Sequence, residues 1–405
     1  MKKLMTVMGM AFAMVDGAYA NVGVFNGSGQ TPIVEKTDAV QMVEEEVLMT
    51  PRKAKGPVTG SCRNFDPMDY RCTFKLRNLK DEAVELQVGF PLDIETYRMK
   101  GVHAEDVGKL VESFNFSACS GNEKFKVRYV PQDKEKRFSK LFLWTMKFAA
   151  HEERTLVVSY TMEGYLGLYY TFAADMQKDD VDDLCKIDGG LLVGLFKTGI
   201  GEVHMYVTGT GSCWAGEIQK ATFKYFPQDF EAYLAKRGAL DETEEERKQR
   251  QEEKGKRGKE AGDKSSKGVR NLLKPECRLV RYWHPSPDKW TRKDDGAGRF
   301  HYELAFTPFR PSEDDSIILG YVAPPMPTEP DDVDILEDVV REFVKSNGGN
   351  EKQYLRDVKD VVLEFYGIKI GNTRIAPFID KQCWKGQESP GQPSIALKKR
   401  LEEKR

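Results

Sequence analysis

The residues with the clearest chemical potential are one cysteine and three histidines. Cys213 would be a nucleophile if His204 or His284 lay beside it, because an imidazole can accept the thiol proton. The competing interpretation is a disulfide or a packed thiol next to Trp214, since no neighbouring residue favours a thiolate. His151 begins a His-Glu-Glu sequence like that of zinc peptidases, but the second histidine four positions on is absent, so we expect no metal site there.

Two other segments could bind a ligand. Residues 175–183 are rich in aspartate, and closely spaced carboxylates can bind Ca²⁺, but the ligand order and the turn glycine of a calcium loop are missing. We therefore expect a solvated loop. Tyr282, Trp283 and Trp290 form an aromatic group that could stack on sugar rings or anchor a partner. The alternative is that these rings fill the edge of a β-sandwich.

No motif in the chain specifies a reaction. The sequence has neither a phosphate-binding loop in the right context nor the nucleophile elbow of hydrolases. We therefore assign no catalytic, cofactor-binding or metal-binding residue and expect no cofactor. The preferred interpretation is a non-enzymatic protein with a binding or structural role. The alternative is an unrecognised hydrolase or carbohydrate-active protein.

The first twenty residues predict where the protein works. Lys2 and Lys3 precede an apolar run over residues 4–15, and residues 18–20, Ala-Tyr-Ala, match the small-residue pattern of a cleavage site. The run is too short to span a bilayer, and no later apolar stretch is long enough. We expect a signal peptide over residues 1–20, no transmembrane segment after its removal, and a periplasmic or secreted location.

Charge and cysteine content add to this expectation. The net charge of −2 over 405 residues argues against nucleic acid as a partner. In an oxidising compartment the seven cysteines become candidates for disulfides. Cys62 and Cys72 bracket a turn-forming sequence and are the best candidate pair, with two separate buried thiols as the alternative.

Hydropathy patterning divides the chain into β and helical parts. Apolar and polar residues alternate from about residue 35 to residue 162, which predicts an N-terminal immunoglobulin-like sandwich over residues 21–165. A second β region follows over residues 166–322, with a charged insertion at 241–270. A Pro-rich linker, residues 323–332, precedes a helical domain at 333–405. The expected fold class is mainly β: two antiparallel β-sandwich-like regions followed by a small all-α C-terminal domain.

The helical domain carries three short motifs. They are residues 363–367, Leu-Glu-Phe-Tyr-Gly, then 377–384, Pro-Phe-Ile-Asp-Lys-Gln-Cys-Trp, and 394–397, Ser-Ile-Ala-Leu. Through them the region of about residues 333–405 resembles the YARHG family, a small extracellular bacterial module. The resemblance implies structural roles for Gly367 and Trp384 and a location outside the cytoplasm.

Residues 210–218, Thr-Gly-Ser-Cys-Trp-Ala-Gly-Glu-Ile, are the most specific of several motifs in the β-rich part of the chain. Through these motifs residues 21–322 are similar to a family of secreted bacterial β-rich proteins of unknown function. The resemblance implies structural roles for Gly211, Trp214 and Gly216. Together with the signal segment it leads us to expect a cell-wall or envelope component, or another envelope protein, as the partner.

Overall fold

The structure of the protein, a computed structural model, describes a set of stretches that cover both the β and the helical parts. They are residues 23–26, 33–34, 36–52, 67–91, 114–131, 140–162, 165–170, 178–227, 280–312, 315–324, 326–327, 329–386 and 393–403. The expected signal peptide, residues 1–20, and the charged insertion, residues 241–270, lie outside the described residues.

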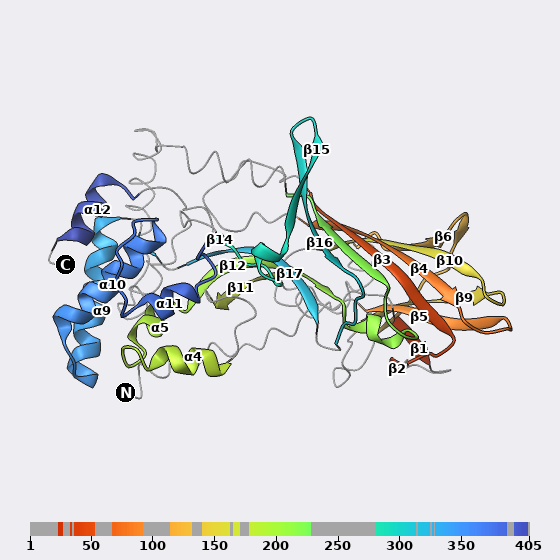
Figure 1. Cartoon of the computed structure of the whole chain (residues 1–405), viewed down its shortest axis with the longest axis horizontal. Helices are drawn as coiled ribbons and strands as arrows, with labels where there is room; N and C mark the ends of the chain where they lie inside the picture. The colour runs from red at the N-terminus through yellow and green to blue at the C-terminus, as the bar shows by residue number, and fades with distance from the viewer. Residues whose placement is uncertain are drawn as a thin grey trace.

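The described strands form three sheets (Figure 1). The five-stranded sheet has the order β2 (Ile33–Val34), β1 (Gly23–Asn26), β5 (Val84–Pro91), β9 (Lys140–Phe148) and β8 (Arg128–Pro131). The eight-stranded sheet has the order β15 (Thr291–Gly296), β16 (Arg299–Phe306), β13 (Lys220–Tyr225), β3 (Val40–Pro51), β4 (Met68–Asn78), β10 (Glu153–Met162), β6 (Ser117–Ser120) and β7 (Glu123–Lys124). The four-stranded sheet has the order β11 (Tyr165–Tyr170), β12 (Thr198–Val207), β17 (Ser316–Ala323) and β14 (Val280–Arg281).

Helices gather at the end of the molecule that also holds the C-terminus (Figure 1). The C-terminal part contains α9 (Pro330–Asn347), α10 (Glu351–Phe365), α11 (Ala376–Asp380) and α12 (Ile395–Glu402). Two earlier helices, α4 (Lys178–Cys185) and α5 (Leu191–Phe196), lie beside them (Figure 1). Short 3₁₀ turns, η2 (Gly209–Cys213) and η3 (Pro287–Lys289), punctuate the β part. The prediction of a mainly β chain with a helical C-terminal part is confirmed.

The eight-stranded sheet runs across the boundary expected near residue 165. Strand β13 pairs with β3 in parallel, and β16 and β15 then extend the same sheet by antiparallel pairing. Three strands from the expected second β region therefore complete a sheet that begins in the first. The reason is that β13 exposes Lys220 beside Glu44 and buries Phe223 beside Val47, so its alternation is in phase with that of β3.

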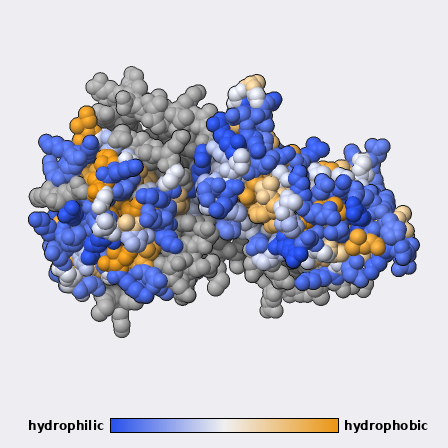
Figure 2. All heavy atoms as spheres, viewed as in Figure 1, coloured by the Kyte–Doolittle hydropathy of each residue, from blue (hydrophilic) through white to orange (hydrophobic). Residues whose placement is uncertain are grey.

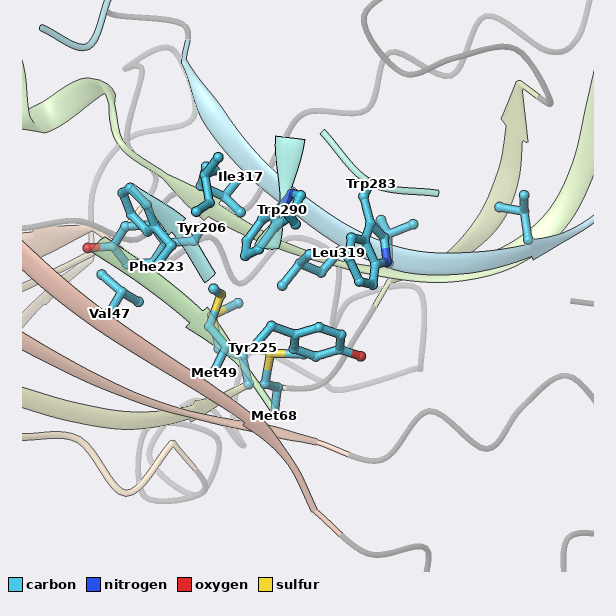
Figure 3. Close-up of a cluster of buried hydrophobic side chains, with 14 of the residues drawn as sticks. Val47, Met49, Met68, Tyr206, Phe223, Tyr225, Trp283, Trp290, Ile317 and Leu319 are labelled. Atoms are coloured by element: carbon cyan, nitrogen blue, oxygen red, sulfur yellow. The ribbon is translucent and has the colours of Figure 1, made fainter. Parts of the chain in front are cut away.

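The core follows from alternation along the strands. In β4, every second side chain from Met68 to Leu76 is buried, which gives the sheet one apolar face. Figure 3 shows where this face meets the four-stranded sheet: Val47 and Phe223 of the large sheet lie toward Tyr206 and Ile317 of the smaller one. The five-stranded sheet also packs against the eight-stranded sheet, because the ring of Phe90 on β5 lies 5.0 Å from the ring of Tyr160 on β10, measured between centroids.

The helical body is assembled from two parts of the chain. Arg374, between α10 and α11, donates a hydrogen bond of 3.1 Å to the main-chain oxygen of Ile187, between α4 and α5. The expected linker is partly helix, because α9 begins at Pro330 with a capping box between Glu329 and Asp332. Before α9, Pro327 is fixed to the helical body, since the hydroxyl of Tyr366 donates to the Pro327 oxygen at 2.6 Å.

Apolar residues at helical spacing on α9 and α10 are largely buried. On α9, Leu336 and Val340 are buried, but Val339 is 40% exposed. On α10, Val358, Val362 and Phe365 are buried. Within the described chain, no helix has the length and apolar character needed to cross a membrane.

Candidate functional site

A carboxylate lies inside the junction of the sheets. Strand β3 contains an irregularity at Val43, which has no counterpart between the pairs Met42–Leu76 and Glu44–Lys75. This bulge shifts the alternation, so that Val43, Glu45 and Val47 all face inward. Glu45 is 1% exposed, and its Oε1 atom accepts a hydrogen bond of 2.8 Å from the hydroxyl of Tyr206 on β12.

Tyrosine rings surround this carboxylate. Tyr70 of β4 stacks on Tyr160 of β10 with 4.7 Å between centroids, and lies 6.3 Å from the ring of Tyr206. Cys72, two residues from Tyr70 on the same face of β4, is fully buried in the same layer. Glu45, Cys72 and the three tyrosines therefore form one buried polar cluster between the sheets, which we call the junction cluster.

Electrostatics make the junction cluster structural and not nucleophilic. Burial, followed by the nearby charge of Glu45, raises the pKa of the Cys72 thiol well above its usual value. Burial likewise raises the pKa of Tyr206, with Cys72 and Glu45 adding to the effect. Because both groups keep their protons at neutral pH, the cluster offers hydrogen bonds between sheets and no thiolate or phenolate.

The predicted disulfide pair is only half visible. Cys62 lies outside the described residues, while Cys72 is a free thiol in the middle of β4 with its side chain in the core. Cys72 therefore lies within a strand, four residues past its start at Met68, and does not directly follow a turn. A pairing of Cys62 with Cys72 stays a prediction.

The predicted aromatic group belongs to the interior. Trp283 is 2% exposed and Trp290 is 6% exposed, and their rings meet edge to face at 5.6 Å. The indole N–H of Trp290 donates to the Pro285 oxygen at 3.0 Å. Tyr282 is half-buried. Figure 3 shows both tryptophans among the core side chains, so neither ring is open for stacking on a ligand, and the sandwich-filling interpretation describes them.

The Gly-Trp motif forms a packed connection. Gly211 is buried in η2, and Trp214 directly after it is buried in the core. Gly216 has a φ of 66°, a left-handed conformation that favours glycine. The Cys213 main-chain oxygen accepts the Thr37 N–H at 2.9 Å, which ties this connection to the segment just before β3.

The remaining chemical candidates are also placed in structural settings. Burial lowers the pKa of His204 to about 3, so this imidazole is neutral and a poor base for Cys213. The aspartate-rich segment was expected to be a solvated loop, but residues 178–183 belong to helix α4, in which Asp182 and Asp183 are exposed and Leu184 is buried. Among the described residues, no group of His, Cys, Asp and Glu has the arrangement of a metal site.

The C-terminal motif residues close and plug the helical body. Gly367 follows α10 with a φ of 77°, and its N–H bonds to the Glu364 oxygen at 2.9 Å, as expected of a helix C-cap. Trp384 is buried and meets the Phe365 ring edge to face at 5.5 Å. Asp357 on α10 is held by Asn372 at 3.0 Å and by Arg374 at 2.8 Å, so the loop after α10 is fixed to it.

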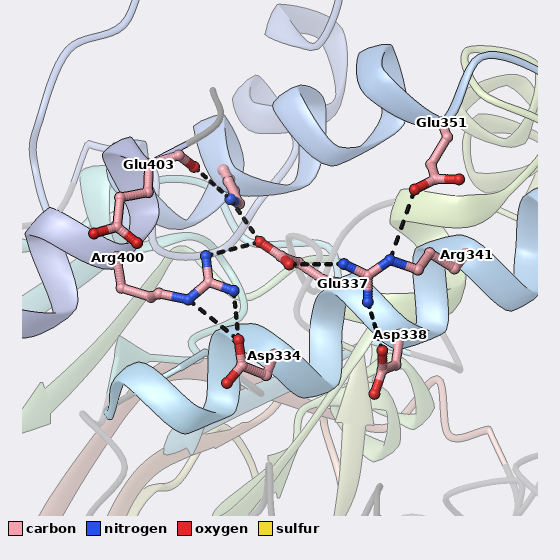
Figure 4. A network of polar contacts seen from close by, with 8 residues as sticks. Asp334, Glu337, Asp338, Arg341, Glu351, Arg400 and Glu403 are labelled. Atoms are coloured by element: carbon pink, nitrogen blue, oxygen red, sulfur yellow. Dashed lines mark hydrogen bonds and ion pairs between the residues drawn. The ribbon is translucent and has the colours of Figure 1, made fainter.

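An ion-pair network ties three helices together (Figure 4). Glu337 on α9 accepts from Lys359 on α10 at 2.7 Å and from Arg400 on α12 at 2.9 Å. Lys359, almost fully buried, also donates to the Glu403 main-chain oxygen at 2.8 Å. Arg400 reaches Asp334 as well. Every charge in the centre of this network is therefore paired.

The most accessible element of the β part is the hairpin of β15 and β16. Figure 1 shows it projecting from the large sheet, and all six residues of β15 are exposed. Strand β15 ends the sheet, so its outer edge has no neighbouring strand in the described part of the chain. Its surface in Figure 2 is mainly hydrophilic.

Side-chain contacts brace the hairpin on both faces. On one face the guanidinium of Arg292 stacks on the Phe300 ring at 4.2 Å from the centroid. On the other face the His301 ring nitrogen lies 2.9 Å from an Asp295 oxygen. The turn between the strands uses positive φ angles at Gly296, Ala297 and Gly298. The arm is therefore a braced ribbon that presents charged side chains beyond the body of the sheet.

Comparison with solved structures finds distant similarities. No family model and no curated protein matches the chain. A Legionella pneumophila protein, provisionally described as a nutrient binding protein, is 12% identical with a TM-score of 0.39, over 95% of this chain and 100% of that one. An M1 zinc metallopeptidase from Deinococcus radiodurans is 6% identical with a TM-score of 0.26, over 72% of this chain and 44% of the peptidase.

At these identities and TM-scores neither similarity says what this chain binds or does. The resemblances to the YARHG family and to the secreted β-rich family remain predictions, since no family model bears on either.

The junction cluster is the feature that sequence patterning missed. Glu45 lies in a run of three glutamates, which by itself indicates a solvated strand edge. The signal that could have found it is the spacing of two along the strand, which places Glu45 on the same face as the apolar residues Val43, Val47 and Met49. A charged residue on the buried face of a strand needs a polar partner from another element, and Tyr206 is that partner.

Proposed function

We propose that this chain is a secreted or periplasmic, non-enzymatic protein that binds a partner at the cell envelope. The extracytoplasmic location is supported by the sequence of residues 1–20, with its basic start, apolar run and Ala-Tyr-Ala end. A binding role is supported by the braced hairpin, which holds exposed Arg292, Lys293 and Asp294 clear of the sheet.

The hairpin is the observation that carries the proposal. A projecting ribbon loses little conformational freedom on binding when its side chains are already held, and Arg292 is held by Phe300. Its free edge can accept a further strand, while its charges choose the partner. The partner expected is a cell-wall or envelope component, or another envelope protein.

Retention on purified envelope fractions tests the binding role. The full chain should be retained, and the double variant Arg292→Glu, Lys293→Glu should be retained roughly tenfold less, because two rim charges that steer and orient binding are reversed. The matched control is Lys398→Glu, Lys399→Glu on α12, which also reverses two exposed charges and should behave like the unchanged chain. Equal retention of the two double variants would rule out the hairpin as the binding element.

Location is tested separately by sequencing the N-terminus of the exported protein. Cleavage after Ala20 should leave Asn21 as the first residue. Recovery of the uncleaved chain from the cytoplasm would contradict the proposed location without bearing on the hairpin.

A further inference from the structure

The outer edge of the hairpin carries an ordered pattern of charge. Strand β15 has the sequence Thr-Arg-Lys-Asp-Asp-Gly, so its first half is basic and its second half is acidic. All six residues are exposed, and the hairpin projects from the large sheet (Figure 1). Within the described part of the chain, β15 pairs only with β16. A strand added at this edge would therefore meet the charge pattern directly.

The faces of β15 determine which charges a neighbouring strand would meet. Arg292 and Asp294 lie on the same face, because a nitrogen of Arg292 lies 3.4 Å from an oxygen of Asp294. Both lie beside Phe300, since Arg292 stacks on its ring and Asp294 is its cross-strand partner. The register with β16 shifts only beyond Asp294, so residues 291–294 form a regular strand.

A second copy of β15 in antiparallel orientation matches this pattern. Directly opposite residues of an antiparallel pair have their side chains on the same face of the sheet. A two-fold axis at Lys293 therefore places Arg292 of each copy opposite Asp294 of the other copy, which gives two pairs of opposite charge. On the other face Lys293 meets its own copy, with Asp295 of the second copy at the diagonal position to offset the like charge.

The same charges oppose other arrangements. Parallel pairing in register would place Arg292 against Arg292 and Asp294 against Asp294, which is unfavourable. Edge strands are commonly protected by charged side chains and by bulges that disturb pairing. Here the irregularity lies toward the turn, and the two signs of charge occupy opposite halves of the strand. The edge is therefore protected against many strands but complementary to its own copy.

We propose that two copies of this chain pair through the outer edges of β15 in antiparallel orientation, which forms a four-stranded ribbon in the order β16–β15–β15–β16. The inference rests on the hairpin being a binding element, as the envelope-binding role does, but not on the identity of an envelope partner. An edge of six residues is a small interface, so the dimer is weak and forms where the chain is concentrated.

Exchange of the two charges tests the pairing, by sedimentation of the purified full chain over a range of concentrations. Arg292→Glu alone and Asp294→Lys alone each place like charges across the edge, so each variant should dimerise roughly tenfold more weakly than the unchanged chain. An equimolar mixture of the two variants restores opposite charges and should dimerise. A single chain that carries both substitutions should dimerise too. The control, Lys398→Glu with Lys399→Glu on α12, should behave like the unchanged chain.

Three results would overturn the proposal. They are an unchanged chain that stays monomeric at every concentration, single variants that dimerise as well as the unchanged chain, and a mixture and a doubly substituted chain that both stay monomeric. Circular dichroism checks that each variant is folded, which is expected because both positions are exposed.

Retention on envelope fractions is measured separately. The doubly substituted chain presents exchanged charges to any other partner, so it should dimerise and yet be retained less than the unchanged chain. Loss of the dimer and loss of envelope binding are therefore distinguishable.

Discussion

The hydroxyl of Tyr206 on β12 donates a 2.8 Å hydrogen bond to Glu45 on β3, so one polar contact joins the four-stranded and eight-stranded sheets inside the core. Both side chains are almost fully buried. Burying a carboxylate is unfavourable unless it is hydrogen-bonded, and Tyr206 offsets part of that cost. The contact therefore fixes how the two sheets pack at a place where apolar contact alone would allow sliding.

Tyr206→Phe should destabilise the chain by about 1–3 kcal/mol, because it removes a partner from a buried acid. Glu45→Gln should cost less, since the amide oxygen still accepts the tyrosine hydrogen bond. Urea unfolding of the single and double variants gives their coupling energy. The control is Glu46→Gln on the opposite, partly exposed face of β3, where the ion pair with Lys224 is worth less than about 1 kcal/mol. Additive effects at positions 45 and 206 would contradict the link.

His204 predicts a loss of stability in mild acid. Burial lowers its pKa from 6.5 to about 3, so between these values the unfolded chain binds a proton that the folded chain does not. Stability is then complete above pH 6.5 and falls by about 1.4 kcal/mol for each pH unit below it, until pH 3. Between pH 6.5 and pH 5, the free energy of unfolding of His204→Leu should fall by roughly 2 kcal/mol less than that of the unchanged chain. Urea unfolding at the two pH values measures this difference. If the free energy of unfolding changed with pH in the same way for both proteins, His204 would not be the source of the loss.

The β architecture could be predicted from sequence because period-two alternation is a local signal. Strand β4 is an example, since its buried residues alternate without interruption from Met68. The helices α9 and α10 could be predicted for the same reason, through their apolar stripes and the cap at Gly367. What could not be predicted is which strands share a sheet. The parallel pairing of β13 with β3 joins positions 220 and 44, and no local pattern encodes that partnership.

The site was harder still, because burial decides chemistry and patterning alone does not give burial. Trp283 and Trp290 are of a residue type common at binding surfaces, yet their rings pack on each other in the core. Glu45 lies in a run of glutamates typical of a solvated strand edge, yet the bulge at Val43 turns it inward. In both cases the side chain's role depends on a neighbour from another sheet, which the sequence of one strand does not contain.

The helical body should weaken in strong acid because of Glu337. Burial alone raises the pKa of Glu337, but hydrogen bonds from Arg400 and Lys359 outweigh it and lower the pKa to about 2. The stabilisation is therefore complete above the unfolded value of 4.5 and is lost as the pH falls toward 2. Glu337→Gln should cost about 3 kcal/mol at pH 7, because Lys359 stays buried without its carboxylate.

Urea unfolding of Glu337→Gln at pH 7 and pH 3 measures this effect. The difference from the unchanged chain should shrink at the lower pH. The control is Asp338→Asn, whose carboxylate pairs with the same helix's Arg341 but is exposed, and it should change stability by less than about 0.5 kcal/mol. A difference that is the same at both pH values would contradict the assignment.

Gly201 sets how closely β12 and β17 approach. A Cβ atom at this position would lie 2.3 Å from the Tyr321 main-chain oxygen and 2.6 Å from a Val322 methyl group. Because the nearest atom is backbone, the strands must separate to admit it, and Gly201→Ala should cost more than about 3 kcal/mol. The control is Gly371→Ala, where no atom lies within 4 Å and only the positive φ of 69° opposes the methyl group. It should cost about 1 kcal/mol. If Gly201→Ala and Gly371→Ala lost the same stability in thermal or urea unfolding, the close approach of β12 and β17 would not be what requires glycine at position 201.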